Sequence, residues 1–348
     1  MLDQLYIPRT VSAVIDFRIK KGESVDSVLK RLEESGLINN KFLVKNFIIF
    51  KGIQVKIKPG LYTIGPQYSV DGIFSEFTRG ADVEVRVGEG WTNREIAKTL
   101  EAKGIVNGAS EFYNLSKNFD NSKGKYKFLP QSRKVDLEGF LFPDTYKFER
   151  LEIEGYEISG IIEKFLDNFE KKVYSRYGDL SVEELNNSII MASLVEKEVQ
   201  TEEDMRLISG ILWKRFEAGM PLQVDATLVY IKCSIRIAQP RPSASDIRML
   251  KRFHALSAGN LRLVPSEYNT DDCRKLTAQD KSIESPYNTY EFNGLPPGAI
   301  SNSGLKAITA AVNPLESPYW YYLSAKDDGR TIFAKTLEEH NQNKEIYR

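Results

Sequence analysis

Carboxylates are the side chains most suited to chemistry in this sequence, because histidine and cysteine are scarce. Among 348 residues there are two histidines, His254 and His340, and two cysteines, Cys233 and Cys273. A zinc site takes three or four His, Cys or carboxylate ligands, and neither an HExxH nor a CxxC spacing occurs. The two histidines also lie in segments without a nucleophile elbow. The sequence therefore predicts no metal and no cofactor, and it favours acid–base chemistry by Asp or Glu.

Glu198 is the carboxylate in the least expected position. A helix is predicted over residues 182–199, and Ser181 with Glu184 forms a capping box at its start. The run 189–195 is apolar except for one serine, so the helix is expected to be buried. At about 100° per residue, Glu198 lies within the wider apolar arc, and Glu196 lies nearly opposite on a narrower apolar strip.

Burial of a glutamate on such a helix raises its pKa towards the range in which it can donate a proton. The alternative for Glu198 is a carboxylate at the helix end that reaches solvent or pairs with Lys197 or Arg206. Periodicity alone leaves both interpretations open.

An internal repeat occupies the first hundred residues. Residues 21–38 and 87–106 each contain a Gly–Glu pair, an amphipathic helix and a closing glycine, Gly36 or Gly104, suited to a left-handed helix cap. Alternating segments at 15–19 and 83–87 predict half-buried strands. The strand–turn–helix units resemble LysM modules, which bind glycans containing N-acetylglucosamine. A divergent scaffold without sugar affinity is the alternative.

The rest of the chain has a different composition. The polar stretch 118–134 predicts a linker, and the sequence from Val135 onward is rich in aromatic residues and helices. We therefore predict an α+β protein with a LysM-like region at 1–117, a linker at 118–134 and a catalytic domain at 135–348. The aromatic residues of its first motif either stack on sugars or belong to the core: Phe140, Phe142 and Tyr146.

Charge and hydropathy exclude some classes of protein. Lys plus Arg equals Asp plus Glu at 48 each, so the basic excess of a typical nucleic-acid-binding protein is missing. No apolar stretch approaches the roughly 20 residues that span a bilayer, and no signal peptide opens the chain. The protein is then either soluble and cytoplasmic or preceded by an anchor.

Cys233 and Cys273 either pair in an oxidising compartment or remain buried thiols.

Five motifs carry a family resemblance. In chain order they are LEGFLFPDTY, MASLVEKE, AGMPLQVDATLVY, SPYNTYEFNGLPPGAISNSGLKAITAAVNP and YYLSAKDDGRTIFAKTLEEHN. Together they resemble the YceG-like (MltG) endolytic murein transglycosylases from about Phe17 to the C-terminus. The resemblance implies a LysM-like domain before a mixed α+β YceG-like catalytic domain. It also implies an enzyme anchored in the membrane and facing outward, although the family's usual transmembrane helix is not found in this sequence.

The resemblance implies peptidoglycan glycan strands as substrate and cell-wall synthesis proteins as partners. The second glutamate of the family's VEKE motif is catalytic, and this position is Glu198 here. A lytic transglycosylase cleaves the β-1,4 bond between N-acetylmuramic acid and N-acetylglucosamine without consuming water. One group protonates the leaving oxygen and then takes the proton of the muramyl C6 hydroxyl, which attacks C1 and gives a 1,6-anhydro end. A hydrolase normally needs a second carboxylate.

The other motifs supply six candidate substrate-binding residues: Glu138, Gln223, Asp225, Tyr287, Asn288 and Tyr290. Glu138 is the best candidate for a second carboxylate, with a structural ion pair as the alternative. Gln223 and Asp225 could bind acetamido groups or orient Glu198, although Asp225 is also well placed as a helix N-cap. The SPYNTY residues resemble the Tyr–Asn pair of other lytic transglycosylases.

Two further functions remain compatible with the sequence. A lysozyme-type hydrolase would use Glu198 together with Glu138 or Asp225, and its products would carry reducing ends. A noncatalytic glycan-binding scaffold would lose nothing measurable when Glu198 is replaced by Gln.

Overall fold

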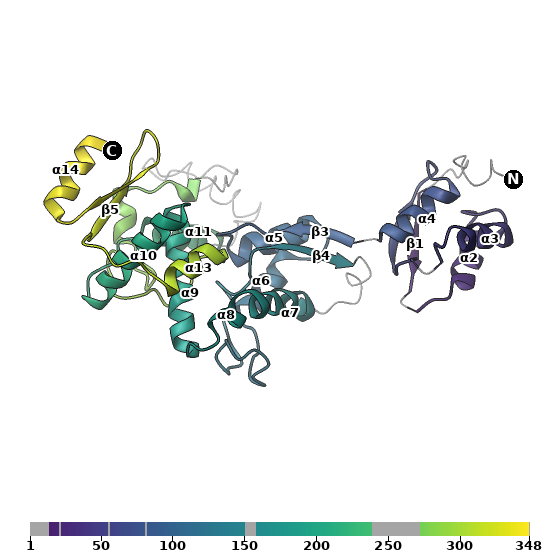
Figure 1. Cartoon of the computed structure of the whole chain (residues 1–348), viewed down its shortest axis with the longest axis horizontal. Coiled ribbons are helices and arrows are strands. Elements are labelled where there is room, and N and C mark those ends of the chain that lie inside the picture. The colour runs from purple at the N-terminus through teal and green to yellow at the C-terminus, as the bar shows by residue number, and fades with distance from the viewer. Residues whose placement is uncertain are drawn as a thin grey trace, which may run out of the picture. The chain divides into compact units, whose positions relative to one another are not determined.

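The computed structural model describes residues 14–20, 22–54, 56–80, 82–149, 158–238 and 272–347. These residues form the predicted mixed α+β structure, in which each sheet is an antiparallel pair of strands (Figure 1). The chain divides into two compact units. The first comprises the described residues up to Gly88 together with Asn93–Ser116 and Pro143–Phe165, and the second comprises Glu89–Thr92, Lys117–Phe142 and the described residues from Leu166 onward.

The first repeat closes a core of its own within the first unit. Its elements are β1 (Ile15–Ile19), α2 (Val25–Glu34), α3 (Lys41–Phe50), β2 (Gly60–Ile64) and α4 (Val70–Arg79). The alternation in β1 places Phe17 in this core, where its ring stacks on Phe77 of α4, and Phe17 is paired with Tyr62 across the hairpin. The sequence predicted one helix after the first strand, within residues 21–38, and the structure contains two, α2 and α3, between β1 and β2.

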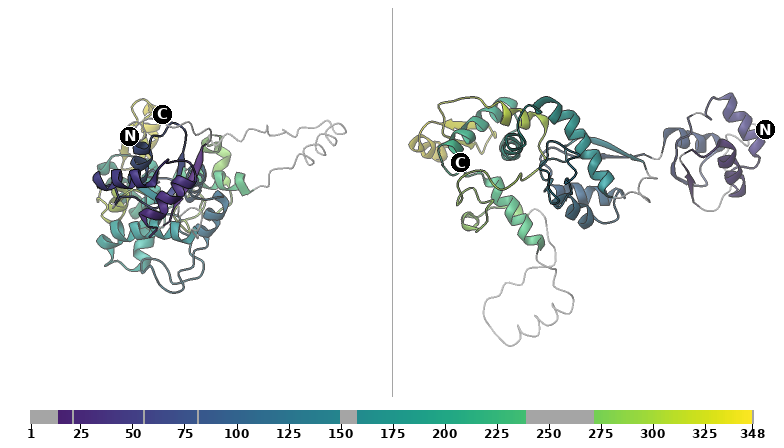
Figure 2. Two further views of the ribbon diagram at one scale, coloured as in Figure 1. Left: turned by 90° about the vertical axis from the view of Figure 1, so that its right-hand side faces the viewer. Right: turned by 90° about the horizontal axis from the view of Figure 1, so that it is seen from below.

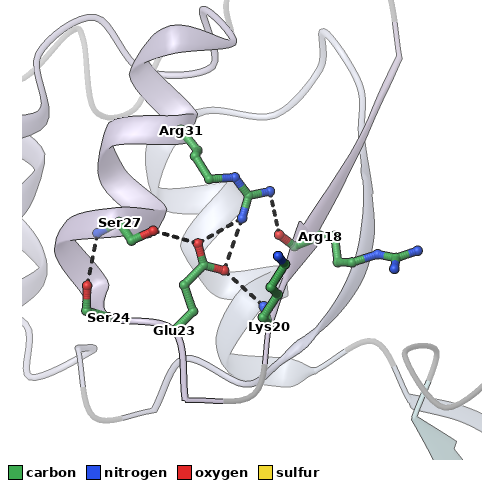
Figure 3. A network of polar contacts seen from close by, with 6 residues as sticks. All are labelled: Arg18, Lys20, Glu23, Ser24, Ser27 and Arg31. Atoms are coloured by element: carbon green, nitrogen blue, oxygen red, sulfur yellow. Dashed lines mark hydrogen bonds and ion pairs between the residues drawn. The ribbon is translucent and has the colours of Figure 1, made fainter. Parts of the chain in front are cut away.

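Figure 3 shows how the Gly–Glu pair of this repeat is used. The carboxylate of Glu23 accepts hydrogen bonds from Arg31, from the Ser27 hydroxyl and from the backbone N–H of Lys20. Arg31 also donates to the carbonyl of Arg18 at 2.7 Å. Burial raises the pKa of Glu23, but these hydrogen bonds outweigh it and lower the pKa overall. The network therefore ties α2 to the end of β1.

The second repeat has the strand–helix–helix–strand order of β1, α2, α3 and β2 in the first. Its elements are β3 (Asp82–Arg86), α5 (Asn93–Ala102), α6 (Ala109–Lys117) and β4 (Thr145–Glu149). Val85 of β3 is paired with Tyr146 of β4, so the repeat is strand–helix–helix–strand and extends beyond the predicted boundary at Val135. Gly36 and Gly104 have φ of 72° and 68°, which confirms the predicted left-handed caps.

The segment 118–134, predicted as a linker, is packed into the second unit in the structure. Phe119, Tyr126 and Phe128 are buried, and the Phe128 ring lies 4.9 Å from that of Phe169. Asn121 is also buried, and its side-chain amide donates to three carbonyls of the same segment. The polar residues therefore surround an ordered loop whose apolar side chains belong to the second unit. Phe140, Phe142 and Tyr146 are core residues as well.

From the middle of the chain onward the elements are α7 (Ile158–Phe169), η2 (Glu170–Tyr174), α8 (Ser175–Tyr177), α9 (Val182–Glu198), α10 (Glu202–Glu217), α11 (Asp225–Ala238), η3 (Asp272–Arg274), η4 (Ala278–Ser282), α13 (Leu305–Val312), β5 (Tyr321–Ser324), β6 (Thr331–Ala334) and α14 (Leu337–Tyr347). Helix α9 packs against α10, α11 and α13 (Figure 1; Figure 2). Its capping box of Ser181 and Glu184 is confirmed. No helix in the described ranges combines the length and apolarity that crossing a membrane requires.

Cys233 and Cys273 form a disulfide that joins α11 to η3. An ion pair of 2.8 Å between Lys232 and Asp280 lies beside it and joins α11 to η4. The pairing selects one of the two alternatives that the sequence left open.

Candidate active site

Glu198 is the last residue of α9 and is half-buried. Its carboxylate accepts a hydrogen bond from the hydroxyl of Tyr322 in β5. Burial of that hydroxyl raises the pKa of Tyr322 well above its usual value, and the negative charge of Glu198 raises it further. Tyr322 therefore remains a neutral donor beside the carboxylate. The two residues come from the separate motifs MASLVEKE and YYLSAKDDG.

Arg215 of α10 brings a positive charge to the same place. Its side chain is buried, with 5% of its surface exposed, and its charge lowers the pKa of Tyr322 against the effect of Glu198. The guanidinium lies 5.7 Å from the ring centroid of Tyr321. One guanidinium nitrogen, Nε, has no hydrogen-bond partner among the described residues. A buried charge with an unused donor is costly, and it is typical of a functional site.

Gln223 is held in an unusual conformation next to Arg215. Its φ is 57°, a left-handed value that no other non-glycine residue in the described ranges adopts. Arg215 donates to its side-chain oxygen at 2.9 Å, and its backbone N–H donates to the Thr289 carbonyl at 2.9 Å. The neighbouring N–H of Val224 donates to the Thr289 hydroxyl. Strain of this kind persists only where the surroundings hold it, and it is concentrated at functional sites.

Asp225 and Tyr290 form a second polar pair nearby. Asp225 is the first residue of α11, and the Tyr290 hydroxyl donates a hydrogen bond to it. The ammonium of Lys281 lies 4.7 Å from the Tyr290 ring centroid. Tyr290 also interacts electrostatically with Tyr322 and Arg215. The structure thus brings the QVDA and SPYNTY motifs together with the VEKE helix.

Asn288, a predicted substrate-binding residue, is engaged within its own loop. Its side chain is fully buried, and its amide donates to the carbonyls of Lys281 and Ile283. Its oxygen accepts from the N–H of Tyr290 at 3.0 Å. Because these bonds occupy the amide, Asn288 shapes the loop that carries Tyr290. Its neighbour Tyr287 is half-buried and packs against the ring of Tyr230.

Glu138 lies in a buried polar network centred on Asn302. The Asn302 oxygen accepts from the N–H groups of Gly139 and Leu141, and its amide donates to the Trp91 carbonyl. The same amide is 3.5 Å from the carboxylate of Glu138. Glu138 is therefore placed in the packed interior of the second unit, where it helps to join three chain segments.

Glu196 has the desolvated environment that the sequence predicted for Glu198. Its carboxylate accepts a hydrogen bond of 2.8 Å from the N–H of Gly304 at the start of α13. The pKa of Glu196 is raised to about 7, and burial is the main cause; the charge of Glu89 adds to the rise, whereas the hydrogen bond from Gly304 and the charge of Lys197 oppose it. Two carboxylates that are two residues apart on α9 thus have different partners.

Sequence reasoning missed Arg215 and Tyr322. Tyr322 lies within a motif that carries the family resemblance, and Arg215 lies just before another, but neither residue is marked by local periodicity. Within the part of the chain that the structure describes, no group of three His, Cys, Asp or Glu side chains could hold a metal ion.

Comparisons with known proteins identify the same family that the five motifs resemble. The sequence profile of the YceG-like family matches residues 17–346. An endolytic murein transglycosylase of Bacillus subtilis is 27% identical over 98% of this chain and 87% of its own length. One from Streptococcus pneumoniae is 26% identical over 93% of this chain, which spans 57% of that relative. The crystal structure of a YceG-like protein from Listeria monocytogenes is similar with a TM-score of 0.54 and 26% identity, over 95% of this chain and 99% of the other. The chain belongs to the YceG-like family.

Proposed function

We propose that this protein is an endolytic lytic transglycosylase of peptidoglycan, which cleaves the β-1,4 bond between N-acetylmuramic acid and N-acetylglucosamine within glycan strands. The names of its relatives support this class of reaction. The observation that carries the assignment of residues is the group formed by Glu198, Tyr322 and Arg215. It combines one half-buried carboxylate with a neutral donor and a positive charge.

Glu198 acts first as the acid. It gives its proton to the glycosidic oxygen as the bond to C1 of the muramyl residue breaks. The resulting carboxylate is stabilised by the Tyr322 hydroxyl and by the charge of Arg215. Glu198 then takes the proton of the muramyl C6 hydroxyl, whose oxygen bonds to C1. Glu198 is thereby protonated again, as it was before the reaction. The product carries a 1,6-anhydro end, and no water is consumed.

The arrangement of the other carboxylates favours this reaction over hydrolysis. Asp225 is engaged by Tyr290, and Glu196 is engaged by the backbone of Gly304. A hydrolase normally requires a second carboxylate that activates water or attacks the sugar. Gln223, on the loop beside Arg215, and Asp225, at the start of α11, remain the proposed contacts for the acetamido groups of the substrate.

A second assignment of the acid has one observation in its favour. The pKa of Glu196, raised to about 7, suits a general acid near neutral pH. Its engagement at the start of α13 instead supports a structural role. Substituting each glutamate separately distinguishes the two assignments.

The proposed substrate also determines the compartment in which the protein acts. Polymeric peptidoglycan lies outside the cytoplasmic membrane, and a Cys233–Cys273 disulfide suits an oxidising environment. We place the protein on the outer face of the membrane, where it shortens or releases strands during cell-wall synthesis. The LysM-like first region would hold the glycan close to the site.

Mass analysis of muropeptides released from purified sacculi tests the proposal. The wild-type chain should release fragments with 1,6-anhydro ends. The Glu198→Gln variant should lower this release by about 10²–10⁴-fold, because the amide keeps the shape and cannot supply the proton. Glu196→Gln should retain most of the activity. Reducing ends would identify a hydrolase, the reverse order of the two variants would make Glu196 the acid, and no release by the wild type would favour a scaffold.

A further inference from the structure

Helix α3 of the first repeat carries an exposed apolar face that its own module leaves uncovered. Phe42, Ile49 and Phe50 are 70%, 50% and 90% exposed, whereas Val44 and Ile48 on the opposite side are buried. The three exposed residues share one side of the helix, since their spacings of seven and eight correspond to about two turns. Other large exposed apolar side chains in the described ranges are scattered over separate elements: Val14, Val182, Phe292, Leu337 and Ile346. A cluster of this kind marks an interaction surface.

The chain segment that contains this face is basic. Residues 41–58 contain five lysines and no Asp or Glu. Residues 14–80 contain eleven Lys and Arg against seven Asp and Glu, a net charge of +4, whereas the whole chain is neutral. Lys45 and Lys51 form ion pairs with Asp26 and Asp71. The remaining lysines of this run give the module its excess positive charge.

The polar groups of the face are few. Asn46 lies between the exposed residues, and its amide donates to the carbonyl of Phe42 within the helix. A glycan is recognised by hydrogen bonds to its hydroxyl and acetamido groups, and this face offers little for them. An interface of anionic lipid requires only apolar side chains that enter the acyl boundary and cations that meet the headgroups.

We propose that the α3 face, formed by Phe42, Ile49 and Phe50, binds the surface of bilayers that contain anionic lipids, together with the lysines of residues 41–58. The phenylalanine rings enter the boundary between headgroups and acyl chains, and the lysines lie at the level of the phosphates. Such contact orients the module on the membrane. The inference does not depend on the proposed enzymatic function, because it involves none of the residues of the site.

Co-sedimentation of the full chain with vesicles tests the inference. The wild type should bind vesicles of phosphatidylcholine and phosphatidylglycerol at 3:1 and should bind pure phosphatidylcholine much less. The Phe42→Ser/Phe50→Ser variant should fold normally, because both rings are exposed. Its partition coefficient for the anionic vesicles should fall by at least about tenfold, since two large apolar contacts are lost. The matched control Phe292→Ser/Ile346→Ser, which removes two exposed apolar residues elsewhere, should bind like the wild type.

Several outcomes would overturn the inference. Equal binding by the two double variants would show that the α3 face is not the contact. Equal binding to vesicles with and without phosphatidylglycerol would show that the lysines do not contribute to the contact. If light scattering shows a wild-type dimer that Phe42→Ser/Phe50→Ser dissociates, and vesicles are not bound, the face joins two copies of the chain. Loss of chitooligosaccharide binding in the same variant, without lipid binding, would make it a glycan site. Product analysis of muropeptides provides the separate test of the enzymatic function.

Discussion

Arg215 donates a hydrogen bond to the side-chain oxygen of Gln223 across 2.9 Å. The bond joins α10 to the loop that precedes α11, and it secures the left-handed backbone of Gln223. The same guanidinium interacts electrostatically with the hydroxyl groups of Tyr290, Tyr321 and Tyr322. The buried guanidinium of Arg215 thus contacts the strained residue Gln223 and also affects Tyr322, which donates to the proposed acid Glu198.

Arg215→Lys is expected to lower kcat by about tenfold or more with little change in KM. Lysine retains the charge, but it lacks the planar fork that reaches Gln223 while facing the tyrosines. Steady-state kinetics on soluble glycan strands measures the two constants. Arg206→Lys on the same helix is the matched control, because Arg206 donates to the Asn313 carbonyl at the other end of α10. A rise in KM at constant kcat would instead place Arg215 in substrate binding.

Tyr322→Phe is expected to lower kcat/KM by about 10–100-fold. The variant loses the hydroxyl that donates to Glu198, and a hydrogen bond to a charged group contributes about 1.5–3 kcal/mol. Rates of release of anhydro-muropeptides provide the measurement. Tyr319→Phe removes a hydroxyl from a neighbouring residue whose ring packs on Phe333, and it should have no effect. If both variants behave like the wild type, Tyr322 does not assist the acid.

Glu196→Gln is expected to make the free energy of unfolding less dependent on pH. The pKa of Glu196 is raised in the folded state to about 7 from an ordinary value of 4.5. The folded protein therefore binds the proton more tightly, so this stabilisation is complete below about pH 4.5 and is lost as pH rises through 7. The variant should exceed the wild type in stability at pH 8 by at most about 3 kcal/mol. Urea unfolding at pH 5 and pH 8 provides the comparison, and parallel pH profiles would contradict the assignment.

Cys233→Ser/Cys273→Ser is expected to destabilise the second unit. The disulfide closes a separation of 40 residues, and the chain-entropy relation assigns such a loop about 4 kcal/mol. Urea unfolding of the variant should match that of the wild type in dithiothreitol. Alkylation of the unreduced wild type should label no cysteine. Labelling of both cysteines under these conditions would show that the bond is not formed.

The local signals in the sequence were sufficient for much of the secondary structure. The capping box of Ser181 and Glu184 predicted the start of α9, and Gly36 and Gly104 predicted the ends of their helices. These features depend on residues within about four positions of one another, so they can be recognised from sequence. Helix α3 was missed because an apolar run with several exposed members has no clear amphipathic period.

The tertiary structure decided how these elements are combined. The sequence by itself determined that α9 is a buried helix carrying two glutamates, Glu196 and Glu198. Which of them meets Tyr322 and which meets Gly304 depends on β5 and α13, both more than 100 residues later in the chain. The pairing of β3 with β4 has the same origin, because β4 lies beyond the segment predicted as a linker. A carboxylate's partners and pKa come from segments that only folding brings together, and no local pattern encodes them.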